Sequence, residues 1–198
     1  MQQIYLFFAT ILLFLGLQGA AFAAAGGEGA ATEKAPMVLV AYFSCTGTTE
    51  ATARQTAEAL GADLHEIRPA EPYTNADLDY RDKGSRSTLE MNDAGSRPAL
   101  AGTVANMAEY DVVFLGYPIW WGQAPRIVAT FLEAHDLSGK TIVPFCTSGG
   151  SGLGSSDREL HARASGATWL PGRRISGSLS GSDVLAWVEG LGLPLAVK

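Results

Sequence analysis

The sequence predicts an α/β fold, a three-layer, doubly wound sheet of five parallel strands in a single domain. From Met37 onward, short runs of apolar and β-branched residues alternate with segments of helical periodicity, which is the pattern of repeated βαβ units. Right-handed crossovers between parallel strands place helices on both faces of such a sheet. The length of 198 residues suits one domain with a substantial core.

The first strand and helix are predicted at residues 38–43 and 49–60. The strand is apolar throughout, as in a central strand that is buried on both faces. In the helix, small and apolar residues recur on one face, and Gly61 supplies a C-cap. The second strand, at 63–67, alternates polar and apolar residues, which suits an edge position.

A polar segment at residues 68–98 has little periodicity and is long for a plain connection. Loops of this length in compact domains are usually functional or mobile, so we expect a lid near the site. A short helix is predicted after it, at residues 99–109.

The second half of the chain continues the alternation. The strongest strand is predicted at 112–117, and Pro125 suits the first position of the helix that follows. Further elements are a strand at 141–146, a helix at 156–164, a strand at 167–175 and a helix at 182–189 capped by Ser182 or Asp183.

The N-terminal segment predicts export. Residues 1–24 carry no charged side chain, are apolar from Ile4 to Leu17 and end in small residues that suit a signal peptidase. An uncleaved membrane anchor is the alternative, because the apolar stretch approaches the length of a membrane helix. Residues 25–36 are predicted to be a flexible linker. In both cases the domain, residues 37–198, is expected outside the cytoplasm, in the periplasm or secreted.

Charge limits the classes of partner. The formal net charge is −6, and all ionisable side chains follow the signal segment. An acidic surface argues against binding nucleic acid or an anionic membrane face. It is compatible with a basic protein partner.

The two cysteines are predicted to be free thiols. Cys45 and Cys146 each follow an apolar strand, and another strand is expected between those two. Strands lie about 4.8 Å apart, so the separation is near 10 Å, beyond the roughly 7 Å limit for a disulfide. The histidines are scattered without metal-ligand spacing, and no metal site is predicted.

The loop after the first strand predicts a phosphate site. In such sheets ligands bind at the carboxyl ends of the strands. The segment Ser44-Cys45-Thr46-Gly47-Thr48-Thr49 carries four hydroxyls beside the N-terminus of a helix, whose amides attract an anion. It lacks Lys and Arg, which suits a monophosphate better than a triphosphate. The alternative is a hydroxyl-rich cap on an ordinary helix.

Two further loops end at the same edge of the sheet. Trp120 and Trp121 follow the central strand, where an indole can stack on a planar ligand, although Trp121 could instead pack under the next helix. The glycines of residues 147–152 allow backbone N–H groups to approach a ligand. Alone, this third segment would be merely a flexible loop, but together the three loops predict one site.

These motifs resemble the flavodoxin family. The matching segments are the loop 44–49, Tyr117-Pro118-Ile119-Trp120-Trp121-Gly122 and Pro144-Phe145-Cys146-Thr147-Ser148-Gly149-Gly150. The resemblance covers nearly all of residues 37–190 and is to short flavodoxin-like proteins with a tryptophan pair after the third strand. It implies the strand order 2-1-3-4-5 and flavin mononucleotide (FMN) as the cofactor.

The resemblance also implies the cofactor contacts. The phosphate loop is matched by Ser44, Thr46, Gly47, Thr48 and Thr49. The loop beside the flavin ring is matched by Pro118, Ile119, Trp120 and Trp121. The loop at the pyrimidine edge is matched by Thr147, Ser148, Gly149, Gly150, Ser151 and Gly152.

One departure from the family bears on the activity. Flavodoxins that carry electrons commonly cover the outer ring face with an aromatic residue from the third loop, and residues 147–155 contain none. An open face suits an oxidoreductase that reduces a small molecule, such as a quinone, by hydride or electron transfer. Tyr73 or Tyr80 could instead supply the cover.

Three functions therefore stay open: an FMN-dependent reductase, an electron carrier that docks a redox protein, and a flavodoxin-like module without cofactor. The reductase is favoured. No side chain is predicted to act as an acid or base, because the flavin would carry the chemistry.

Overall fold

The computed structural model describes residues 35–193 and 195. The predicted signal segment, residues 1–24, and nearly all of the linker lie outside the described residues. Within the described part, no helix combines the length and the apolar character needed to cross a bilayer.

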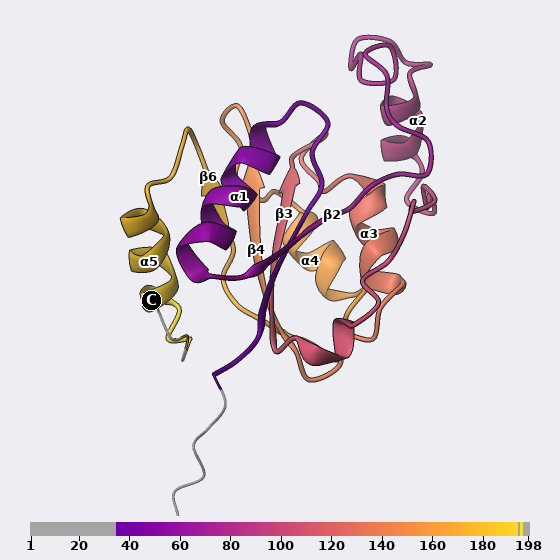
Figure 1. The fold of residues 1–198 in the computed structure, drawn as a ribbon. Helices are drawn as coiled ribbons and strands as arrows, with labels where there is room; N and C mark the ends of the chain where they lie inside the picture. The colour runs from indigo at the N-terminus through magenta and orange to yellow at the C-terminus, as the bar shows by residue number, and fades with distance from the viewer. Residues whose placement is uncertain (1–34, 194, 196–198) are drawn as a thin grey trace, which may run out of the picture. The chain divides into compact units, whose positions relative to one another are not determined.

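A parallel sheet forms the centre of the domain, with the strand order β2-β1-β3-β4-β5 (Figure 1). The predicted order and fold class are confirmed. The central strands β1, β3 and β4 are mostly apolar and almost wholly buried, whereas β2 at the edge has exposed ends, Asp63 and Glu66, and only half-buried residues between them. The strands are β1 (Val38–Tyr42), β2 (Asp63–Glu66), β3 (Val112–Pro118), β4 (Thr141–Thr147), β5 (Thr168–Trp169) and β6 (Arg173–Ile175).

The fifth position of the sheet holds two short strands instead of the continuous strand predicted at 167–175. Both β5 and β6 pair with β4, in the register Ile142 to Trp169 and Phe145 to Arg173. On β4, Pro144 lies between the stretch that pairs with β5 and the stretch that pairs with β6. On the other side of the pairing, Pro171 lies between β5 and β6. Proline has no N–H group to donate to the ladder, so pairing is interrupted there.

Helices cover both faces of the sheet and close two apolar cores. On one face, α1 (Thr48–Leu60) and α5 (Gly181–Gly190) pack over Val40, Phe114 and Phe145. On the other face, α3 (Arg126–Glu133) and α4 (Ser156–His161) enclose a second core (Figure 1). Alternate residues of each strand point to opposite faces, so β1 supplies Leu39 to one core and Val40 to the other.

The segment between β2 and β3 differs from the prediction. The helix predicted at 99–109 is wrong, because Leu100 pairs with Pro69 in an antiparallel bridge and only a short 3₁₀ turn, Met107–Glu109, is helical. Within the polar segment a helix does form, α2 (Arg86–Asn92), capped by the Ser85 side chain. The last helix is capped by Ser180, two residues before the predicted Ser182, through a reciprocal pair of hydrogen bonds with Asp183.

Candidate functional site

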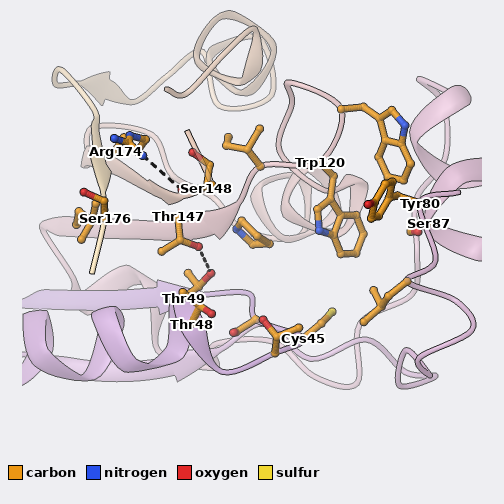
Figure 2. A pocket seen from close by; sticks show the side chains of 18 of the residues that line it. Cys45, Thr48, Thr49, Tyr80, Ser87, Trp120, Thr147, Ser148, Arg174 and Ser176 are labelled. Atoms are coloured by element: carbon orange, nitrogen blue, oxygen red, sulfur yellow. Dashed lines mark hydrogen bonds between the residues drawn. The ribbon is translucent and has the colours of Figure 1, made fainter. Parts of the chain in front are cut away.

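A cavity of about 750 Å³ lies at the carboxyl ends of the strands (Figure 2). Its volume is within the roughly 300–1,000 Å³ that ligand sites span. All three predicted loops reach it. The predicted site residues that line it are Ser44, Thr46, Thr48, Thr49, Pro118, Ile119, Trp120, Trp121, Thr147, Ser148 and Gly149. The remaining four, Gly47, Gly150, Ser151 and Gly152, are not among its lining residues.

The N-terminus of α1 opens toward the cavity without a side-chain cap. Gly47 precedes the helix with a φ of 84°, a left-handed conformation that glycine adopts without strain. The Ser44 hydroxyl accepts a hydrogen bond from the Gly47 amide at 3.1 Å, which folds the loop back on itself. The first helical amides have no intrahelical partners, so this end can bind an anion. The alternative prediction for this loop is a hydroxyl-rich cap on the helix, but no side chain of the described residues caps α1.

Two hydrogen bonds join the first, second and third loops. The buried Thr49 hydroxyl lies 2.7 Å from the Thr147 hydroxyl, and the Ile119 amide donates to the Thr147 carbonyl at 3.0 Å (Figure 2 shows the threonine pair). Thr147 therefore connects all three loops at the base of the cavity.

The tryptophan pair stands on a tight turn. Trp120 and Gln123 exchange two backbone hydrogen bonds of 2.9 Å, and both residues between them have positive φ, 48° at Trp121 and 77° at Gly122. Trp121 is the only residue other than glycine with positive φ in the described part of the chain. A strained backbone of this kind is often found at binding sites. The turn leaves the Trp121 side chain 46% exposed at the cavity, not packed under the next helix.

The third loop rests on this turn. The Ser155 amide donates to the Gly122 carbonyl at 3.0 Å, and Gly154 approaches the same carbonyl so closely that a Cβ atom would lie 2.0 Å from it. The glycine at 154 is required for this contact.

The polar segment supplies a wall that no sequence motif indicated. Leu78, Tyr80 and Ser87 line the cavity from this side, and Cys45 lines it from the first loop. At the opposite end, the cavity is lined by Arg174, Ile175, Ser176 and Gly177, which follow or belong to β6. Periodicity cannot reveal such residues, because their role depends on which strand ends meet. The segment 68–98, which we expect to form a lid, does contribute side chains to the cavity.

Of the two tyrosines considered as ring covers, only Tyr80 lines the cavity. Tyr73 packs edge-on against Phe43 and Trp120, with ring centroids 5.8 and 5.5 Å apart. Its hydroxyl donates to Glu90 at 2.5 Å, and the Arg86 guanidinium lies 4.1 Å from its ring centroid. Tyr73 therefore anchors the wall behind Trp120.

The cavity is nearly free of charge. Among the described residues that line it, Arg174 is the only one with a charged side chain, and its Nη1 donates to the Ser148 carbonyl at 3.4 Å. Burial raises the pKa of the Cys45 thiol to about 12, although nearby Arg86 opposes the shift, so the thiol is protonated at neutral pH. Both cysteines are free thiols, as predicted. No group of three or more metal-ligating side chains occurs in the part of the chain that the structure describes.

This arrangement can hold a molecule with an anionic group at one point and a planar ring at another. The uncapped helix end and the hydroxyls of the first loop suit a phosphate, and the indoles of the second loop suit a ring. The lining offers hydroxyl, amide and aromatic groups and no carboxylate or imidazole.

Comparison with known proteins agrees with this geometry. The family model described as flavodoxin matches residues 37–191. A candidate flavoprotein from Bacteroides eggerthii DSM 20697 is 48% identical, with a TM-score of 0.76, over 79% of this chain and 98% of that one. A second, from Bacteroides uniformis ATCC 8492, is 47% identical, with a TM-score of 0.74, over 79% and 99% of the two chains.

A more distant structure shares the fold. The flavoprotein from Lactobacillus acidophilus NCFM, solved in complex with FMN, is 20% identical, with a TM-score of 0.61, over 78% of this chain and 99% of that one. The search of curated proteins found no match.

Proposed function

This chain belongs to the flavodoxin family, and from that premise we propose that it binds FMN and acts as an oxidoreductase for a small planar acceptor. One observation carries the proposal: an uncapped, hydroxyl-rich helix N-terminus and an exposed tryptophan turn line the same cavity.

The residues present fit the phosphate of FMN. Thr46 and Thr48 are exposed in the cavity, beside helix amides that have no intrahelical partner. The absence of a lysine in this loop favours a monophosphate over a triphosphate. Arg174 adds one positive charge to the same cavity.

The residues present also fit a planar ring. Trp120 and Trp121 offer aromatic surface, and Ile119, held to Thr147 by its amide, fixes the distance between the second and third loops. Backbone groups of residues 147–149 remain to bind the polar edge of the ring. The flavin, when bound, supplies the transfer of electrons to the acceptor. The chain itself binds, orients and partly shields both molecules.

A titration with FMN tests the proposal. Replacing Thr46 and Thr48 together by alanine removes two hydroxyls from the phosphate loop, and we expect FMN to bind about ten- to a hundredfold more weakly. Thr103→Ala serves as the control, because Thr103 is exposed and lies outside the cavity. Equal FMN affinity in the double variant and the wild type would contradict the phosphate assignment.

A second function, that of an electron carrier, is favoured by one observation. Tyr80 lines the cavity and is 68% exposed, so it could cover a ring face that the third loop leaves open. A carrier would exchange electrons rapidly with a redox protein and turn over quinones slowly. Steady-state turnover of a quinone or an azo dye would favour the reductase.

Export remains a proposal that rests on the sequence of residues 1–24. We propose that the domain works in the periplasm or outside the cell. Reduced nicotinamide cofactors are scarce there, so the electron source would be a protein or a membrane quinol.

A further inference from the structure

The hydroxyl of Ser87 is the feature of the cavity that the proposed function leaves unexplained. Ser87 lies in the first turn of α2, its side chain is 2% exposed, and it lines the cavity. Its Oγ atom has no hydrogen-bond partner among the described residues. Burying a hydroxyl without a partner is costly, so most buried hydroxyls in proteins are hydrogen-bonded.

The surroundings of Ser87 are aromatic and apolar. Figure 2 shows Ser87 beside Tyr80, on the side of the cavity away from Arg174. Leu78 and Trp120 line the same cavity, and we define the acceptor lobe as Cys45, Leu78, Tyr80, Ser87 and Trp120. Cys45 contributes a neutral thiol, because burial keeps it protonated. The lobe contains no carboxylate, ammonium, guanidinium or imidazole group.

The wall that carries Ser87 is held in place by α3. Arg126, which is 9% exposed, donates to the carbonyl oxygens of Met91 at 2.9 Å and Asp93 at 3.1 Å, at the end of α2. The Ser87 amide donates to the Asp77 carbonyl at 3.0 Å.

A second set of contacts holds the same wall from within. The Arg86 side chain bonds Glu90 at 2.7 Å and the Glu71 carbonyl at 2.8 Å. The wall that carries Ser87 is therefore held in place before a ligand binds, so little ordering of the wall is needed on binding.

We propose that the acceptor lobe binds an uncharged planar carbonyl compound, and that the Ser87 hydroxyl donates a hydrogen bond to its carbonyl oxygen. The inference rests on the proposed function and names the class of its acceptor. The aromatic lining favours a planar ring, and the lack of charge favours a neutral molecule. The unpartnered hydroxyl favours a ligand with an oxygen atom that accepts a hydrogen bond. Ser87 belongs to none of the three loops that fit FMN, so its partner is assigned to the acceptor. Ser87 binds the acceptor directly and takes no part in proton transfer.

A pair of ligands with the same ring skeleton tests the hydrogen bond. Menadione carries two carbonyl groups on a methylnaphthalene skeleton, and 2-methylnaphthalene carries none. Binding of each to the oxidised, FMN-loaded protein is measured by equilibrium dialysis, for the wild type and for Ser87→Ala. Ser96→Ala is the control variant, because Ser96 lies outside the cavity.

We expect Ser87→Ala to weaken menadione about three- to tenfold, the usual loss for one hydrogen bond. Binding of 2-methylnaphthalene and of FMN should not weaken, and Ser96→Ala should match the wild type. The melting temperature of Ser87→Ala should be unchanged or higher, because the variant removes an unpartnered buried hydroxyl.

Four results would overturn the inference alone: no loss of menadione affinity, an equal loss for both ligands, an FMN affinity that falls by the same factor, or a marked loss of stability in Ser87→Ala. A wild-type protein that binds FMN and no menadione would also overturn it while leaving FMN binding intact. A wild-type protein that binds no FMN would overturn the proposed function, and the inference with it.

Discussion

Hydroxyl groups determine the chemistry of the cavity at the scale of single residues. Thr49 and Thr147 bond each other at the base, while Thr46 and Thr48 leave theirs exposed to a ligand. Neighbouring threonines of one loop therefore have different roles. A substitution of Thr49 would disturb the contact between two loops, whereas substitutions of Thr46 and Thr48 address the ligand directly.

The Cys45 thiol should react slowly despite its place in the cavity wall. Burial raises its pKa to about 12, so at pH 8 only about one molecule in ten thousand carries the thiolate, against about a quarter for a free cysteine. We expect alkylation by iodoacetamide to be about a thousandfold slower in the native protein than in urea. The rate should rise with pH throughout the range from 8 to 10, because the thiolate fraction is still increasing there.

Mass spectrometry of the alkylated protein separates Cys45 from Cys146, which is buried and whose pKa is raised to about 11 by that burial. Complete alkylation of native Cys45 within minutes at pH 7.5 would show that the thiol is not protected.

At the scale of elements, the second and third loops form one unit through the contact of Gly154 with Gly122. Gly154 has a φ of 62°, and a Cβ atom there would overlap the Gly122 carbonyl. We expect Gly154→Ala to destabilise the protein by about 2 kcal/mol or more and to weaken FMN binding, because the tryptophan turn must move. Urea unfolding and FMN titration measure the two effects.

Gly102→Ala is the matched control for this variant. Gly102 has open space around its Cβ position and no positive φ, so its replacement should change stability by less than about 0.5 kcal/mol. If the two alanine variants were equally stable, the loops would not depend on this contact.

The regular elements could be predicted from the sequence where their pattern is local. The apolar strands β1, β3 and β4 and the helix after Pro125 are examples. In contrast, α2 has no apolar stripe, and it depends on Arg126, which is distant in sequence. The sequence does offer a signal for its N-cap, because Ser85 precedes the helix and its side chain accepts a hydrogen bond from the Thr88 amide. The N-cap of α5 is Ser180, whereas the sequence predicts Ser182 or Asp183, because both serine positions offer a hydroxyl.

The candidate site could be predicted only where its residues belong to a local sequence motif. The loops carry local motifs, and eleven of the predicted residues do line the cavity. Tyr80, Ser87 and Arg174 carry no motif. They reach the cavity because a polar segment folds over the strand ends and because β6 follows an interruption of the sheet.

At the scale of the whole molecule, location and charge limit which donor can bring electrons to the cavity. If the domain works outside the cytoplasm, NADPH is not its natural donor. The described residues that line the cavity provide one cationic side chain, Arg174, to attract its several phosphates. We expect NADPH at micromolar concentrations to reduce the FMN-loaded protein slowly, as followed by bleaching of the flavin absorbance. Rapid reduction under those conditions would count against a donor of the quinol or protein class.

We propose that one cavity binds FMN and that the N-terminus of α1 binds its phosphate. Comparison of FMN with riboflavin, which has the same ring and lacks the phosphate, tests it most directly. Quenching of flavin fluorescence on addition of the purified domain gives both dissociation constants. A phosphate held by several amides and hydroxyls should make FMN bind at least about a hundredfold more tightly than riboflavin. Equal affinities would contradict the assignment of the phosphate to the N-terminus of α1, and no binding of either flavin would contradict FMN binding by this cavity.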